Sequence, residues 1–454
     1  MAVLFIIPIL LGKLKRKKSK IILLIKRKMF SFRKFDYLQK ITLIVVTIWI
    51  ITQLVVVLKL NNMLQWPDAR MNYIPNSLWH FEHGTFYPTA HNLYDNYIQS
   101  IGYVNLLVVL LHLFGSFKAV MMVNVLMNVG IVECIYYLGK KFFSKKVACV
   151  AVLLYCLLLS NLFIPLYIMS DLPSLFFSLL GFCLVLRRRW IWVIVGGLLI
   201  GYAHTVRFYE IAFVLPLLYY MLKNRYKWYL FFLFLLPYFG VIHSTGIYSR
   251  NQTGIYVTSA TTNGFGLVKI ALGNGKGDVG NKIFSDTTNP NYQGLPDTYS
   301  FAQKDSIWKE RARPGLKSKA LIYTLYFPAR VKKLFMRDTF FIPETYRFNS
   351  NSCQNAAIGA RCEALYRLGI LYNNLIYYIV IFFFVISLCM CRKDIFLSQG
   401  IFLAILSIMV CGFAGYIAEE RYHYPCIFIM CLWGAHGIDY VLHKNRFLFK
   451  HDFT

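Results

Sequence analysis

Residues 41–60 read ITLIVVTIWIITQLVVVLKL, and Lys59 is the only charged residue among them. About 20 predominantly apolar residues are enough for a helix to cross the hydrocarbon core of a bilayer. The whole chain follows this pattern: of its 454 residues 57% are hydrophobic and 15% are charged, and its mean hydropathy is +0.51. This composition excludes an ordinary soluble domain and predicts an all-α protein that crosses the membrane many times.

Further apolar runs follow the first, so we predict about ten transmembrane helices with both chain termini in the cytoplasm. Short clusters of Lys and Arg separate the runs, and in this arrangement every cluster falls on the cytoplasmic side, as the positive-inside rule requires. The net charge of +29 therefore reflects topology and does not indicate nucleic acid as a partner. The further runs are residues 120–138, 147–167, 172–186, 190–203, 211–222, 228–248, 368–391, 395–417 and 425–442.

The predicted topology divides the chain into segments. Within the first outer loop, residues 103–114 are apolar but too short to span, so we predict an interfacial helix that ends at Gly115. Met29 is a second candidate for the natural start of the chain. The segments are a basic cytoplasmic N-terminus (1–40), a transmembrane module (41–247) with the first outer loop at 61–118, a long extracytoplasmic loop (248–367), C-terminal transmembrane helices (368–442) and a cytoplasmic tail (443–454).

Polar and charged residues collect at the predicted outer ends of the apolar runs. A carboxylate at the membrane boundary is costly unless it lines a polar cavity, so we expect these residues to meet in a cavity at the outer leaflet. The alternative for any one of them is that it simply faces water. They form four groups: Asp68, Arg70, Tyr73, His80, Glu82 and His83; Asp171; His204, Arg207 and Glu210; and Glu419, Glu420, Arg421 and His423.

These residue types suit a lipid-linked phosphosugar. A carboxylate can take a proton from a hydroxyl or hold a divalent metal ion. An arginine at the membrane boundary can bind a phosphate through two parallel hydrogen bonds. A sugar joined to a membrane lipid through phosphate needs both, because the acceptor must lose a proton while the phosphate leaves. We expect catalysis by Asp68 and Asp171. We expect the donor phosphate to contact Arg207, Arg421 and His423.

Two cysteines stand apart from the others. Cys353 and Cys362 lie in the predicted outer loop, in the stretch NSCQNAAIGARCEAL. On an oxidising face they can form a disulfide, and two free thiols are the alternative. The other cysteines lie mostly in apolar runs, where cysteine behaves as a small hydrophobic residue.

Several stretches, taken in order, resemble the polyprenyl-phosphate-sugar-dependent glycosyltransferases of the GT-C superfamily. This group includes protein O-mannosyltransferases and lipid A aminoarabinose transferases. The first likeness is an aspartate just after the first span, followed by an aromatic-rich stretch and a short apolar helix ending in Leu-Phe-Gly. The others are YYLGKKFFSKKVACVAVLLY, IMSDLPSLFFSLLGFCLVL, GGLLIGYAHTVRFYEIAFVLPLLYYML, TTNGFGLVKIALGNGKGDVG and ERYHYPCIFIMCLWGAHGI.

The resemblance implies transfer of a sugar, with inversion, from a polyprenyl-phosphate donor to a hydroxyl of a glycan, glycolipid or protein. It implies a site on the extracytoplasmic side of a bacterial-type inner membrane, in contact with membrane lipids. Asp68 would be the general base, and Asp171 would orient it or share a divalent metal ion with it. Many relatives carry two adjacent acidic residues where this chain has Asp68 with Arg70 beside it. The substrate would be lined by Tyr73, His80, Glu420 and Asn274.

A flippase or polymerase of lipid-linked glycans is the alternative function. Such a protein is expected to carry charges buried in mid-span along a translocation path. Glu133 is the one obvious acid in the middle of a predicted span, which favours the transferase. A purely structural membrane protein would leave the outer charged groups unexplained.

Overall fold

The computed structural model describes most of the chain, and two units are distinguished within it. The first unit is Met1–Ile48 and the second is Trp49–Thr454. All contacts discussed below lie within the second unit. The described residues are 36–59, 68–89, 98–260, 263–272, 282–296, 298–318, 320–342, 356–390, 393–416 and 420–451.

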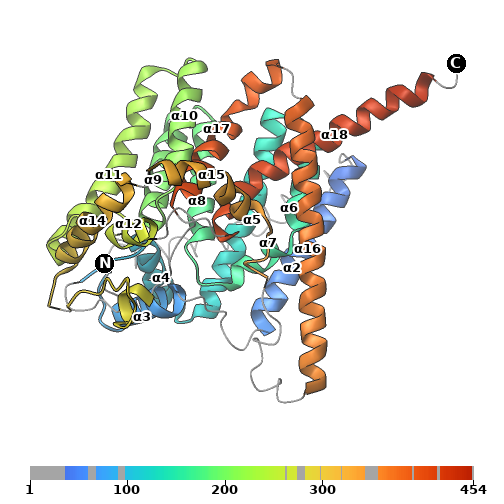
Figure 1. Ribbon diagram of the computed structural model, residues 1–454. Coiled ribbons are helices and arrows are strands. Elements are labelled where there is room, and N and C mark those ends of the chain that lie inside the picture. Colours follow the sequence, from blue (N-terminus) through green and yellow to red (C-terminus); the bar gives the residue numbers. More distant parts are fainter. Residues whose placement is uncertain are drawn as a thin grey trace, which may run out of the picture. The chain divides into compact units, whose positions relative to one another are not determined.

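Every regular element among the described residues is a helix, and this part of the chain contains no β-strand (Figure 1). The predicted all-α class is therefore confirmed for these residues. The helices are α2 (Tyr37–Lys59), η2 (Ala69–Tyr73), α3 (Ile74–Glu82), α4 (Ile101–Phe114), α5 (Phe117–Phe142), α6 (Lys145–Leu157), α7 (Leu159–Phe163), η3 (Ile164–Leu166), α8 (Asp171–Val185), α9 (Trp190–Val206), α10 (Ile211–Lys223), α11 (Trp228–Thr253), α12 (Asn263–Leu272), α13 (Lys282–Ser285), α14 (Phe301–Ser318), α15 (Ala320–Phe335), α16 (Ala356–Met390), α17 (Lys393–Tyr416), η6 (Glu420–Cys426) and α18 (Ile427–His451).

The predicted count of about ten spans is not confirmed. By length and composition, 5 of the described helices can cross a membrane: α2, α5, α11, the segment Glu363–Met390 and the segment Glu420–Leu442. A further pair, Lys145–Leu157 with Leu159–Leu166, is bent by 72° and raises the number to 6 if it is one broken span. Each predicted run coincides with a helix, but α8, α9 and α10 have 15, 17 and 13 residues. Helices of that length are shorter than the roughly 20 residues that one straight span needs.

Helix α9 lies between α8 and α11 and packs on both through small residues. A Cβ atom at Gly196 would lie 2.8 Å from the carbonyl oxygen of Gly181 in α8. A Cβ atom at Gly197 would run into the carbonyl oxygen of Phe234 in α11. Two adjacent glycines thus let one helix approach two neighbours closely. Small residues at helix contacts serve this purpose in membrane proteins, where bilayer lipid removes most of the hydrophobic drive for helices to associate.

A second group of helices forms around α18, which packs on α6 and α16. Helix α5 contacts both α6 and α8 and so connects this group to the α8–α9–α11 layer. Helix α4 lies where the sequence predicts a helix that ends at Gly115, and it packs on α3 and α9. Its interfacial position in a membrane stays a prediction.

We expect Gly197→Ala to destabilise the protein, because the new methyl group would meet backbone in α11, which cannot rotate away. Overpacking of this kind costs about 1–3 kcal/mol. The matched control is Gly240→Ala in α11, where nothing lies within 4 Å of the added Cβ. The control should be neutral or stabilising, because Ala is the better helix former. Thermal unfolding of the two purified variants in detergent measures the difference, and equal melting temperatures would contradict the close approach of α9 and α11.

Candidate functional site

Asp171 and Arg207 form a buried ion pair between two neighbouring helices. Asp171 is the first residue of α8, and Arg207 directly follows the last residue of α9. The two helices are consecutive and joined by a short turn, so the start of α8 and the end of α9 lie at the same end of the pair. Arg207 Nη1 is 2.7 Å from Asp171 Oδ2, and the side chains are 14% and 1% exposed.

Asp68 and Arg421 form a second ion pair from segments more than 300 residues apart in the chain. Asp68 directly precedes η2, and Arg421 lies in η6, the helix that leads into α18. Arg421 Nη1 is 2.7 Å from Asp68 Oδ2. The arginine side chain is 10% exposed and the aspartate side chain 28% exposed. Asp68 is therefore the more accessible of the two aspartates.

The ring of Tyr422 brings the two ion pairs into one cluster. The guanidinium carbons of Arg207 and Arg421 lie 5.0 and 5.1 Å from its centroid. Both arginines therefore make a cation–π contact with the same aromatic ring. We call Asp68, Asp171, Arg207 and Arg421 the aspartate–arginine cluster.

Tyr73 connects η2 to the start of α8. Its buried hydroxyl is 3.3 Å from Ser100 Oγ and 3.3 Å from Ser170 Oγ. Arg207 Nη1 in turn donates to Ser170 Oγ over 3.5 Å. Burial, together with the nearby Asp68 charge, raises the pKa of Tyr73 to about 12. The tyrosine is thus a neutral hydrogen-bonding group that holds η2 beside the cluster.

The surroundings of Asp68 are positively charged. Burial by itself would raise the pKa of Asp68, but the charges of Arg421, Arg207 and Lys269 outweigh it and hold the pKa below its usual value. Lys269 comes from α12 and is itself 7% exposed. Asp68 is therefore ionised and, while Arg421 stays against it, a weak base.

The aspartate–arginine cluster fits an anion better than a metal ion. No group of three or more His, Cys, Asp or Glu side chains among the described residues is placed to hold a metal. Each aspartate already faces a guanidinium, and the cations beside them would repel a divalent ion. The divalent metal predicted for Asp68 and Asp171 therefore stays a prediction. Two guanidinium groups held side by side suit a phosphate, which each can bind through charge-assisted hydrogen bonds.

Other predicted site residues have partners outside the cluster. His423 Nδ1 is 2.9 Å from the carbonyl oxygen of Leu334, and His423 Nε2 is 3.1 Å from Asp338 Oδ1. Glu420 binds Arg337 and accepts a hydrogen bond from Thr339 over 2.9 Å. Both residues thus hold the segment that follows α15 against η6, and their described contacts are structural.

His80 also lies in a local network. Its Nδ1 is 2.8 Å from Thr85 Oγ1, and its ring packs edge-on against Tyr87. Burial and the neighbouring His83 lower the pKa of His80 to about 4, so the ring is neutral at physiological pH. Asn274 and Cys353 lie outside the described residues, as does the side chain of Cys362, so the predicted disulfide stays a prediction.

The residues His204, Arg207 and Glu210, predicted as one polar group, fall into two separate sets of contacts. Arg207 joins the cluster, whereas His204 and Glu210 pair with each other at 2.8 Å. Tyr238 of α11 donates to Glu210 over 3.1 Å, and Thr258 lies 2.9 Å from His204. These contacts connect α9 to α11 and to the segment after it.

Two residues near the cluster were missed by sequence reasoning. Tyr422 sits next to a predicted site residue, but an aromatic ring in an aromatic-rich chain gives no distinct signal. Lys269 carried a usable signal, because it is a lone charge in the apolar run FGLVKIAL. The mid-span acid Glu133 is exposed on α5, so it does not lie inside the bundle.

Comparison with known proteins gives a distant structural likeness. No protein-family model and no curated protein matches the sequence. Two crystal structures of the Archaeoglobus fulgidus oligosaccharyltransferase resemble the chain: a complex with Zn and sulfate (13% identity, TM-score 0.43), and a form tethered by a disulfide bond to an acceptor peptide with the NVT sequon (14% identity, TM-score 0.41). Each match covers 89% of this chain and 50% of the other, so this chain spans about half their length. TM-scores this low do not establish a shared fold, and the functional assignment depends on the site's own residues.

We expect Arg207→Ala to destabilise the protein strongly, because it leaves the carboxylate of Asp171 buried without its cation. Breaking a buried ion pair from one side typically costs about 3–5 kcal/mol. The double variant Asp171→Asn, Arg207→Ala should recover much of the lost stability, since neither charge of the pair remains. Thermal unfolding in detergent checks both.

The matched control for this cycle is Arg367→Ala. Arg367 pairs with Glu363 at 2.6 Å, but the side chains are 74% and 51% exposed. Exposed pairs contribute about 0–1 kcal/mol. If Arg207→Ala and Arg367→Ala had the same small effect, the Asp171–Arg207 pair would not be the buried interaction described above.

Proposed function

We propose that this protein transfers a sugar from a polyprenyl-phosphate donor to a hydroxyl group at a membrane surface. The observation that supports this most is the aspartate–arginine cluster. It combines an accessible carboxylate, a proton acceptor, with two guanidinium groups suited to a phosphate. The ordered sequence likeness to GT-C glycosyltransferases supports the same activity.

The donor phosphate would bind between Arg207 and Arg421, with Lys269 as a third cation. Both arginines contact Tyr422, which limits their freedom and presents them side by side. Guanidinium groups held in this way lose less conformational entropy on binding phosphate than free side chains would. The lipid tail would stay in the bilayer beside the apolar helices.

Asp68 is the better candidate for the general base, and Asp171 for a positioning residue. A base must come within hydrogen-bond distance of the acceptor hydroxyl. Asp68 is 28% exposed, whereas Asp171 is 1% exposed and faces Arg207. Asp171 would thus hold Arg207 in place and not touch the substrate.

Donor binding would also activate the base. With the donor absent, Arg421 is paired with Asp68 and lowers its basicity. A phosphate that takes over Arg421 would free one carboxylate oxygen and offset the nearby positive charge. Both changes raise the pKa of Asp68, so the base becomes competent when the donor is present.

The chemical step is a single displacement. The acceptor oxygen attacks the anomeric carbon, and its proton passes to Asp68. The bond between the anomeric carbon and the phosphate oxygen breaks, and the polyprenyl phosphate leaves as an anion held by Arg207 and Arg421. One displacement from the opposite face inverts the anomeric centre. A flippase gains no support, because the mid-span acid Glu133 faces outward.

We expect Asp68→Asn to bind the donor but to lose turnover by about 10²–10⁴-fold, because an amide cannot accept the proton. Asparagine still offers Arg421 a carbonyl oxygen, so the fold should persist. Arg421→Ala should instead weaken donor binding, since a charge-assisted contact contributes about 1.5–3 kcal/mol. Sugar transfer and donor binding are measured with a polyprenyl-phosphate sugar. Near-normal transfer by Asp68→Asn would remove Asp68 from the mechanism.

We expect the pH dependence of kcat to differ from that of kcat/KM. The acid limb of kcat/KM reports Asp68 in the free protein, whose pKa is below the usual value. The acid limb of kcat reports the donor complex, in which Arg421 holds phosphate and the pKa of Asp68 is higher. On acidification, kcat should therefore begin to fall at a higher pH than kcat/KM does. Coincident acid limbs would show that the donor leaves the Asp68–Arg421 pair intact.

A further inference from the structure

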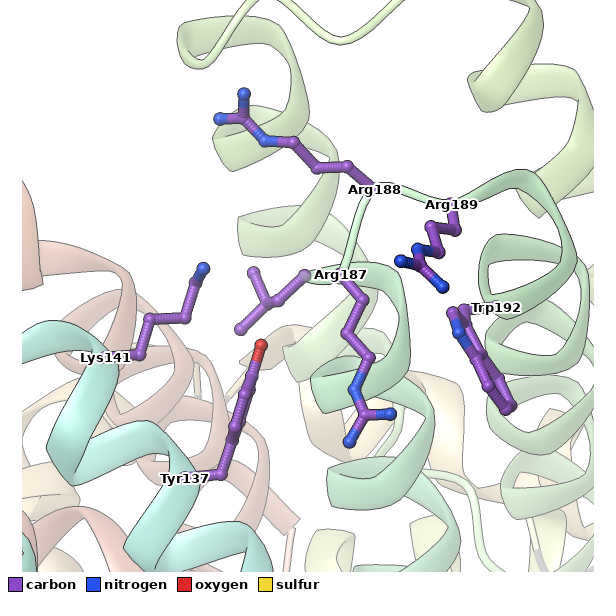
Figure 2. Close-up of a pocket in the computed structure, with 7 residues that line it drawn as sticks. Tyr137, Lys141, Arg187, Arg188, Arg189 and Trp192 are labelled. Carbon is purple, nitrogen blue, oxygen red and sulfur yellow. The ribbon is translucent and has the colours of Figure 1, made fainter.

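A cationic cavity lies at the opposite end of α8 from Asp171. It has a volume of about 610 Å³ and no acidic residue in its lining. Helix α8 runs from Asp171 to Val185, and at 1.5 Å per residue its 15 residues separate the two ends by about 22 Å. The cavity is therefore distinct from the aspartate–arginine cluster. It is lined by Tyr137, Lys141, Leu186, Arg187, Arg188, Arg189 and Trp192 (Figure 2).

Among the described residues, none of Lys141, Arg187, Arg188 and Arg189 forms an ion pair. Lys141, Arg187 and Arg189 line the same space, and an anion placed between like charges removes their repulsion. Basic residues that only set topology need no shared cavity, so their arrangement around one indicates a binding function.

Aromatic residues hold two of the arginines in place. Arg187 runs between Tyr137 of α5 and Trp192 of α9, with its guanidinium carbon 5.9 and 5.6 Å from the ring centroids (Figure 2). Arg188 turns the other way, over Tyr226 at 4.8 Å. The backbone φ of Arg188 is 61°, an uncommon left-handed value. The side chain of Arg188 therefore leaves the backbone in a different direction from those of Arg187 and Arg189. The cavity is thus built from oriented guanidinium groups.

Exposed tryptophans indicate that the cavity lies at the depth of lipid headgroups. Trp190 begins α9 and is 56% exposed, and Trp228 begins α11 and is 73% exposed. Tryptophan is enriched at membrane–water interfaces, where lipid phosphates also lie. Guanidinium groups match phosphate oxygens in geometry and charge.

We propose that this cavity binds the phosphate group of an anionic membrane lipid. Arg187, Arg189 and Lys141 would contact the phosphate, and the acyl chains would lie along the apolar helices α5 and α9. Because the cavity would recognise the phosphate group itself, free inorganic phosphate could also bind there. The experiment must therefore distinguish a lipid phosphate from inorganic phosphate. The site is independent of sugar transfer and needs no substrate to be tested.

The test measures binding of short-chain phosphatidylglycerol to the full-length protein in uncharged detergent, by native mass spectrometry. We expect Arg187→Gln, Arg189→Gln to bind it about tenfold more weakly or worse, because two charge-assisted contacts are lost. The matched control is Lys146→Gln, Lys227→Gln, which removes two exposed lysines that do not line the cavity. The control should bind as the parent does. Arg187→Lys, Arg189→Lys keeps the charges but loses the planar guanidinium groups, so it should bind more weakly than the parent and more tightly than the glutamine variant.

Three outcomes would overturn the proposal. Equal losses in the cavity variant and the lysine control would mean that binding follows overall charge and not the cavity. Equal binding of phosphatidylcholine and phosphatidylglycerol would mean that the cavity does not select an anion. Displacement of phosphatidylglycerol by inorganic phosphate at similar concentration would assign the site to a free phosphate and not to a lipid.

Discussion

The arrangement of the candidate site depends on the need of each buried arginine for an anion. A guanidinium moved out of water loses several kcal/mol of hydration, which a well-placed carboxylate must offset. Asp171 sits at the start of α8 and Arg207 at the end of α9. Helix dipoles favour an anion at the first position and a cation at the second, so the pair complements both helices. The close approach of α8 and α9 at Gly181 and Gly196 keeps the two helices that carry this pair side by side.

The two aspartates differ in exposure, although the sequence predicts both at the outer ends of apolar helices. Asp171 is enclosed, and its partner is fixed by two adjacent helices. Asp68 reaches its partner from an irregular stretch, and 28% of its side chain is exposed. A group that must exchange a proton with a substrate has to be accessible, whereas a group that only orients a neighbour is better buried. The same residue type thus suits two tasks at one site.

Much of the fold could be predicted from the sequence, because apolar runs between basic clusters have one stable form in a membrane. The convergence of Asp171 with Arg207 was also predictable, since the two belong to consecutive helices. Which arginine pairs with which aspartate could not be predicted, because either aspartate could pair with any of several arginines predicted at the outer ends of the helices. His423 was predicted to bind phosphate but contacts Asp338, whose position after α15 follows from tertiary packing. The count of spans was unpredictable because helix length and bending, as at Leu158, depend on neighbouring helices.

In the two proposals, the ends of α8 bind anions under different conditions. At the end that begins with Asp171, each arginine already has an aspartate, so an incoming phosphate must compete with a carboxylate for its partner. Competition of this kind weakens binding and lets the carboxylate return when the phosphate leaves, which suits a donor that turns over. At the end that continues into Arg187, no acidic side chain among the described residues lines the cavity, so a bound phosphate would keep the full attraction of the cations. Under these proposals, the positions of the two aspartates, and not the number of arginines, would decide which end of α8 exchanges its phosphate and which end keeps it.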